Sequence, residues 1–221
     1  MRLFDINNYC FRDVVEPIPD NCYLVETQDE INQISASITG GGEVWVESGK
    51  LRWSGKAPSF SHIWQDGKWV LDESKQAELL NQQRQQIRTQ INTKRDACVN
   101  GGVYVSEIGK WVDTDEKGRA TLVEIKADFD LNGTQEANGE PRIFTLICAD
   151  NTAQPLDFDK FKAVWNAAAK LKESMFENAY MHKILLEQAE KPLEYDWSIG
   201  WAKTFEEYQN EQQAKAAKTE E

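Results

Sequence analysis

The sequence predicts an α+β protein with a small β-rich N-terminal domain, a long polar connecting helix and a C-terminal domain in which a helix packs on a small sheet. Three observations lead to this class. Short alternating apolar and polar runs separated by turn dipeptides fill residues 1–70. A polar stretch without glycine or proline covers 72–98, and a broad apolar stripe with helical spacing begins near residue 157. The expected segments are 1–70, 71–98, 99–200 and 201–221.

The N-terminal part predicts two short strands and a helix. Residues 9–15 and 22–27 are the strand candidates, and the prolines between them exclude a central strand there. Residues 28–38 place isoleucines at three- and four-residue steps, which predicts a short amphipathic helix. The three glycines at 40–42 end that helix, because glycine adopts left-handed conformations without a Cβ penalty.

Two tryptophan-bearing hairpins follow. Residues 43–53 turn at Ser48-Gly49, and the stretch SHIWQDGKWV at 61–70 turns at Asp66-Gly67. Tryptophan buries a large area and is enriched at protein interfaces, so these indoles are candidates for partner binding. The alternative, that they fill the core of a small domain, stays open. The candidate partner-binding residues are Trp45, Trp53, Trp64 and Trp69.

The polar stretch 72–98 predicts the longest uninterrupted helix of the first half, closed by Gly101-Gly102. Its apolar positions follow a broken coiled-coil spacing, with Arg84 at a seam position. Such a stripe is too narrow for a buried core helix, so we expect either a solvated spacer or a homo-oligomer contact. The contact residues in that case are Leu80, Ile87 and Ile91.

The C-terminal part predicts a hairpin, a strand and two helices. The hairpin lies at 103–112, and 115–141 begins with a helix or strand, which the pattern does not decide, and ends in a polar loop. Residues 142–151 carry the strongest strand signal of the chain. Asp157 is placed to cap a helix that runs to about residue 190. The box Thr204-Phe205-Glu206-Glu207 opens a last helix, whose polar end we expect to fray.

The composition excludes some classes of binding partner. A net charge of −12 without a basic stripe argues against a nucleic-acid partner and against an anionic membrane surface. No run approaches the roughly 20 apolar residues that span a bilayer. The four cysteines are far apart, which predicts reduced, mostly buried thiols in a cytoplasm.

Residue patterns for catalysis and cofactors are also missing from the sequence. Neither His62 nor His182 has a cysteine or carboxylate at metal-ligand spacing, and no GxSxG motif occurs. The alternating acidic residues of 128–140 could indicate a calcium site. In an EF-hand loop that starts at Asp128, however, the required glutamate would be at residue 139, and Glu140 follows it by one residue, so a polar loop is favoured. We therefore expect no catalytic residues, no metal and no cofactor.

Several motifs in this order resemble a known family. The run PIPDNCYLVETQDEINQISASITGGGEVWVESGKLRW, then WQDGKWV, then a Gln/Glu/Lys-rich helix, resembles the phage tail fibre assembly proteins. The portion from INTKRDACVNGGVYV to ADNTAQPLDFDKFKAVWNAA resembles a second phage and prophage domain of uncharacterised function, often found in tail fibre or tail fibre assembly proteins. Together the two likenesses cover roughly residues 10–190.

The resemblance implies a chaperone that binds a phage tail fibre protein and helps it fold or trimerise, with no catalytic residue and no cofactor. It would act in the bacterial host cytoplasm during assembly, and whether it is then retained in the virion tail stays open. One alternative is a permanent virion tail or baseplate accessory protein. A second is a carbohydrate-binding module, because aromatic faces also suit sugar rings.

Overall fold

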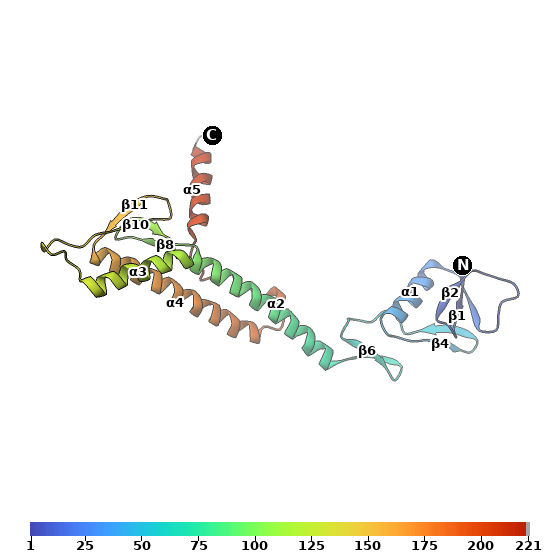
Figure 1. Ribbon diagram of the computed structural model, residues 1–221. Coiled ribbons are helices and arrows are strands. Elements are labelled where there is room, and N and C mark those ends of the chain that lie inside the picture. Colours follow the sequence, from blue (N-terminus) through green and yellow to red (C-terminus); the bar gives the residue numbers. More distant parts are fainter. Residues whose placement is uncertain (220–221) are drawn as a thin grey trace. The chain divides into compact units, whose positions relative to one another are not determined.

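The computed structural model describes residues 1–219 and confirms the α+β class, with helices and small antiparallel sheets. The chain forms two compact units, Met1–Asn81 and a second that begins at Gln82 (Figure 1). The division falls inside helix α2 (Glu73–Asn100), between the boundaries that the sequence suggested on either side of 71–98. Each unit has buried apolar clusters of its own.

The first unit begins with a three-stranded sheet in the order β2-β1-β3. Its strands are β1 (Arg2–Asp5), β2 (Cys10–Arg12) and β3 (Cys22–Val25). The strands β2 and β3 lie within the predicted segments, whereas the central strand β1 was not predicted. Both of its neighbours pair with it in antiparallel fashion. The outer edge of β3 therefore has no strand partner in the described part of the chain.

Helix α1 (Gln28–Thr39) is the predicted amphipathic helix. Thr27 and Glu30 form a reciprocal capping box at its start, which satisfies backbone N–H groups that have no partner inside the helix. Ile34 is fully buried and packs with Phe4 of β1 and Val25 of β3. The same cluster takes up residues of the next hairpin, so α1 joins the sheet and the hairpin in one core.

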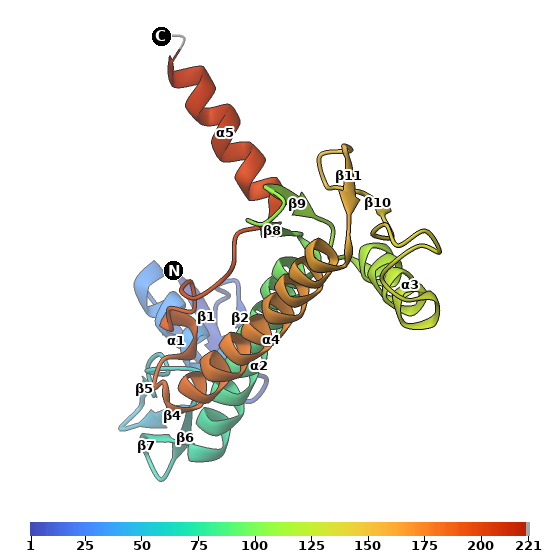
Figure 2. The same cartoon turned by 90° about the vertical axis from the view of Figure 1, so that its left-hand side faces the viewer.

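Both tryptophan hairpins form as predicted. The first pairs β4 (Val44–Glu47) with β5 (Lys50–Trp53), and the second pairs β6 (His62–Gln65) with β7 (Lys68–Leu71) (Figure 2). Each turn has two residues with positive φ, between 49° and 77°. Such turns match the twist of the flanking strands, and in the second residue glycine carries no steric cost.

The second unit is built on two long antiparallel helices. Helix α4 (Phe158–Gln188) begins at the predicted cap Asp157 and lies along α2. Ile87 and Ile91 are 4% and 0% exposed, in a cluster with residues of α4 and with Trp197 and Trp201. The expectation that this stripe is too narrow for a core helix is therefore wrong for these turns. Leu80, in the turns of α2 that belong to the first unit, is half-buried.

A second core lies between two short hairpins, α3 and the start of α4. The hairpins are β8 (Val103–Val105) with β9 (Lys110–Val112), and β10 (Phe144–Ile147) with β11 (Ala153–Leu156). The undecided segment forms helix α3 (Glu116–Asn132), capped by Asp115. Asp128 and Asp130 thus lie in a helix instead of a loop, and Asp128 accepts a hydrogen bond from Arg142.

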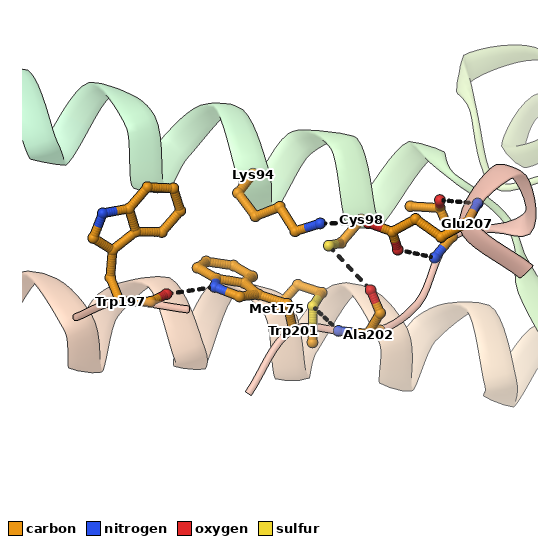
Figure 3. Close-up of polar contacts among 8 residues, drawn as sticks. Lys94, Cys98, Met175, Trp197, Trp201, Ala202 and Glu207 are labelled. Carbon is orange, nitrogen blue, oxygen red and sulfur yellow. Dashed lines mark hydrogen bonds and ion pairs between the residues drawn. The ribbon is translucent and has the colours of Figure 1, made fainter. Parts of the chain in front are cut away.

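The C-terminal segment packs against α2 and α4 before it leaves them. A 3₁₀ turn η1 (Pro192–Glu194) leads into it, and helix α5 (Phe205–Thr219) follows it. Cys98 of α2 and Met175 of α4 both contact Ala202 of this segment, and Lys94 of α2 binds Glu207 in the first turn of α5 (Figure 3). Thr204 and Glu207 form the predicted capping box. The expected fraying of the last residues falls partly on 220 and 221, which lie outside the described residues.

Candidate protein-interaction surface

Three tryptophans of the first unit gather into one cluster across two hairpins. Trp45 of β4 stacks on Trp64 of β6, with ring centroids 6.2 Å apart and 27° between the planes. Trp69 of β7 meets Trp64 edge to face at 5.3 Å, because the two residues oppose each other in the β6–β7 ladder. All three side chains are half-buried. We call Trp45, Trp64 and Trp69 the tryptophan cluster.

Two of the three indole N–H groups of the cluster have partners within the unit. Trp69 Nε1 donates to the backbone oxygen of Ser54 at 3.0 Å, and Trp64 Nε1 donates to the carboxylate of Glu43 at 3.2 Å. Trp45 Nε1 has no hydrogen-bond partner among residues 1–219. Trp45 is therefore the member of the cluster whose indole N–H is not engaged by another residue of the described chain.

The close approach of the two hairpins depends on Gly42. A Cβ on Gly42 would lie 2.0 Å from Ser54 Oγ and 3.0 Å from a ring carbon of Trp69. Only glycine lets the chain before β4 lie this close to the end of β5 and to the Trp69 ring. The glycine run that ends α1 therefore also provides the space in which the tryptophan cluster forms.

Trp53, the fourth predicted residue, lies apart from the other three. It opposes Val44 in the β4–β5 ladder, and both face the core under α1. Trp45 is the next residue after Val44, so it points to the other face of the hairpin. Trp53 Nε1 donates to Gln33 of α1 at 3.0 Å. The four predicted residues thus divide into a three-residue cluster and one residue that packs against α1.

A second exposed apolar surface lies on α4 and was not predicted. Phe176, Tyr180 and Ile184 follow one another at four-residue steps and are 45%, 65% and 37% exposed. Met181 and Leu185 beside them are also exposed. The guanidinium of Arg95 on α2 lies over the Phe176 ring, 4.6 Å from its centroid, so this end of the row is partly covered.

Both histidines have hydrogen-bond partners within their own units. His182 is 4% exposed, with Nδ1 2.8 Å from the Tyr195 hydroxyl and Nε2 3.0 Å from the carbonyl oxygen of Ile199. Because that carbonyl can only accept, Nε2 carries the proton and Nδ1 accepts from Tyr195. His62 is half-buried, and its Nδ1 lies 2.8 Å from Ser59 Oγ. His182 therefore serves to fix the C-terminal segment on α4.

The shifted pKa values in the second unit are caused by hydrogen bonds and burial that hold its elements together. The pKa of Asp150 is lowered from 3.8 to about 2, chiefly by hydrogen bonds from Lys110 and Thr152. The pKa of Glu207 is lowered and that of Lys94 raised, each because of the hydrogen bond between them, which is 2.7 Å long. Burial raises the pKa of the Cys98 thiol. These groups tie β9, α2 and α5 to their neighbours.

The described residues contain neither a metal-binding cluster nor a membrane-spanning helix. Residues 1–219 contain no group of three or more histidine, cysteine or acidic side chains arranged to hold a metal ion. In the same part of the chain, no helix combines the length and the apolar character needed to cross a bilayer. The four cysteines are free, and Cys10 is the one that is only half-buried.

A comparison with protein families finds a match in the second unit. No curated protein and no solved structure matches the chain. One family does, described as a domain of unknown function (DUF4376), and it matches residues 82–199. The match begins at the residue where the second compact unit begins. Because it covers more than half of the 221 residues, the chain belongs to the DUF4376 family.

Proposed function

We propose that this chain is a phage tail fibre assembly chaperone, which binds the fibre protein and assists its folding or trimerisation through protein–protein contacts. The tryptophan cluster is the observation that carries the proposal. It presents three half-buried indoles on the side of the β4–β5 hairpin that faces away from α1. The likeness of residues 17–53 and 64–70 to tail fibre assembly proteins supplies the identity of the partner.

The residue type and the rigidity of this cluster both favour tight binding of a partner protein. A few large aromatic side chains usually carry most of the free energy of a protein interface. Trp64 and Trp69 are held in place by each other and by their N–H partners, so little side-chain entropy is lost when a partner covers them. Trp45 adds an unpaired N–H donor. The exposed apolar row on α4 offers a second contact surface, on the other unit.

In this proposal the partner is the fibre protein, and the site of action is the bacterial host cytoplasm during tail assembly. The proposal includes no nucleic acid and no membrane, because the net charge of −12 would repel phosphate groups. The tryptophan cluster, with Trp53 beside the core, forms the partner-binding part of the first unit.

Co-expression tests the proposal directly. The fibre gene next to the gene for this chain is expressed alone, with the wild-type chain, and with the Trp45→Ala variant. We expect soluble, trimeric fibre only with the wild-type chain. Trp45→Ala should lose at least about fivefold, which corresponds to about 1 kcal/mol of binding free energy. Trp165→Ala is the matched control, since it removes a half-buried indole from the second unit. Equal yields with and without the chain would contradict the proposal.

A permanent virion component is the second candidate, which the same exposed surfaces would also serve. Mass spectrometry of purified particles separates the two, because a chaperone is absent or far below fibre stoichiometry. A carbohydrate-binding module would use the half-buried Trp45 ring as a stacking platform. A glycan array that gives no signal with the wild-type chain would remove that alternative.

A further inference from the structure

Two free strand edges face each other across a groove in the first unit. Strand β3 is at the edge of the β2-β1-β3 sheet, and β5 pairs only with β4 in the described chain. A groove of about 560 Å³ is lined on one side by β3 and Glu26, and on the other by β5 and Gly49. Each of the two strands is four residues long. An unpaired edge of this kind is a template for another extended chain.

The ladder alternation identifies the backbone groups that face the groove. Ile6 N donates to Asn21 O, so in the β1–β3 ladder the hydrogen-bonded positions of β3 are Asn21, Tyr23 and Val25. The N–H and C=O of Leu24 therefore point away from β1. Beyond Val25 the edge is closed, because the backbone N–H of Glu26 donates to the Glu30 carboxylate.

The backbone groups of β5 alternate in the same way. Ser54 N donates to Glu43 O, so Arg52 and Lys50 are the hydrogen-bonded positions toward β4. The N–H and C=O of Leu51 and Trp53 point away from β4. Both walls of the groove thus present unpaired donors and acceptors at the spacing of an extended chain.

Helix α1 forms the base under both walls. Val25 of β3 and Leu51 and Trp53 of β5 pack in the same cluster as Ile34 of α1. A strand placed in the groove would continue one sheet in the order β2-β1-β3, added strand, β5-β4, covered by α1 on one face. Its inward side chains would meet Val25, Leu51 and Trp53, which selects apolar residues.

The face of the groove that points away from α1 carries charged side chains. Lys50 and Arg52 alternate with Leu51 and Trp53, so they lie on the outer face, beside Leu24, which is 39% exposed. The carboxylate of Glu30 is already engaged by two backbone N–H groups and a hydroxyl of the helix cap. Arg52 is already paired with Glu47, its Nε lying 3.2 Å from the carboxylate, so Lys50 is the cation that the outward side chains of an added strand meet. An acidic residue is therefore favoured at the position beside Lys50.

We propose that an extended segment of a partner polypeptide, with alternating apolar and acidic residues, inserts between β3 and β5 and pairs with both edges. For the identity of that partner the inference rests on the proposed function, since the fibre protein is the source. The groove also lies next to the tryptophan cluster, because Arg52 opposes Trp45 in the hairpin. One partner can therefore occupy the groove and cover the cluster.

Amide hydrogen exchange of the full chain, followed by NMR, tests the pairing residue by residue. In the free protein we expect the amides of Leu24, Leu51 and Trp53 to exchange quickly and those of Tyr23 and Arg52 to be protected by their ladders. When the fibre binds, we expect the first three to slow by at least about tenfold. If the fibre binds while these three amides still exchange quickly, strand insertion is wrong and the chaperone function stands.

A second arm uses hexapeptide probes and does not depend on the fibre. The acetylated and amidated peptide of alternating Val and Glu should bind and protect the same amides, and its version N-methylated at every second residue should not. The double variant Lys50→Glu/Arg52→Glu should bind the Val–Glu peptide about tenfold more weakly and prefer a Val–Lys peptide. Circular dichroism of the variant checks its fold.

The outcomes distinguish the two proposals. Fibre that gains no solubility from the chain, together with protection by the Val–Glu peptide, removes the chaperone function and keeps the groove as a strand-binding site. No protection by either fibre or peptide overturns the strand insertion. Protection of these amides by self-association at high concentration, without peptide, would assign the groove to a second copy of the chain and would also overturn it.

Discussion

Trp45 stacks on Trp64 although the two residues belong to different hairpins, and this contact joins β4–β5 to β6–β7. Trp64 also meets Trp69 edge to face and donates its N–H to Glu43. Trp64 is thus the central residue of the cluster, and Trp45 is its outer member. The two residues should differ in what their removal costs.

Trp64→Ala is expected to lower the free energy of unfolding of the first unit by about 2–3 kcal/mol, because it removes two aromatic contacts and leaves a gap between the hairpins. Trp45→Ala should cost only about 1 kcal/mol, since one contact is lost. Urea unfolding followed by far-ultraviolet circular dichroism measures both. Equal losses, or a larger loss for Trp45→Ala, would show that Trp64 does not join the hairpins.

Asp150 makes the second unit sensitive to acid. Its folded pKa of about 2 lies below the ordinary value of 3.8 because Lys110 and Thr152 donate hydrogen bonds to the carboxylate. The unfolded chain therefore takes up this proton at a higher pH than the folded chain. The stabilisation is complete above the unfolded pKa and is lost as the pH falls through the folded one.

We therefore expect Asp150→Asn to lower the thermal midpoint at neutral pH, and the difference from wild type to shrink as the pH falls from about 4 to about 2. Lys110→Met should reduce the same pH dependence, because it removes the main donor. Thermal unfolding at a series of pH values provides the measurement. A difference that stays constant across this range would mean that Asp150 is not held by these hydrogen bonds.

Cys98 should be an unreactive thiol. It is fully buried, its Sγ donates to the carbonyl oxygen of Ala202 at 3.2 Å, and burial raises its pKa. Because the thiolate is the nucleophile, alkylation requires both exposure and deprotonation. Mass spectrometry after brief maleimide treatment should find Cys10 labelled first and Cys98 labelled only in urea. Equal labelling rates in the native state would contradict the packing of the C-terminal segment on α2.

Local signals predicted most of the secondary structure. The pairs Ser48-Gly49 and Asp66-Gly67 mark both hairpin turns, and Asp157 marks the start of α4, because each needs a particular backbone or hydrogen-bond chemistry. The strand β11 was missed because Pro155 lacks a donor, yet a two-stranded ribbon tolerates it at an edge. The helix α3 was undecided because exposed Val123 interrupts its buried spacing.

The sequence predicted the arrangement of the candidate site only in part. Proximity in sequence suggested one set of four tryptophans, but Trp53 faces α1 and Trp45 faces away. A signal for this existed, because a two-residue turn fixes the register that places Arg52, and not Trp53, opposite Trp45. The groove between β3 and β5 had no such signal, since it depends on how α1 holds two separate sheets.

The stripe of α2 was misjudged because its partners come from far along the chain. Ile91 is fully buried. It packs in a cluster with residues of α4 and with Trp197 and Trp201. Ile91→Ala should therefore cost about 2–4 kcal/mol of unfolding free energy, the usual cost of a cavity at a buried aliphatic site.

Leu80→Ala is the matched control, because Leu80 lies on the same helix and is only half-buried. Its removal should cost about 1 kcal/mol or less, since less apolar area returns to water. Urea unfolding at two protein concentrations measures both variants. A loss for Ile91→Ala that depends on protein concentration would restore the oligomer interpretation of α2. A loss independent of concentration, and clearly larger than that for Leu80→Ala, would place Ile91 in the core of a single chain.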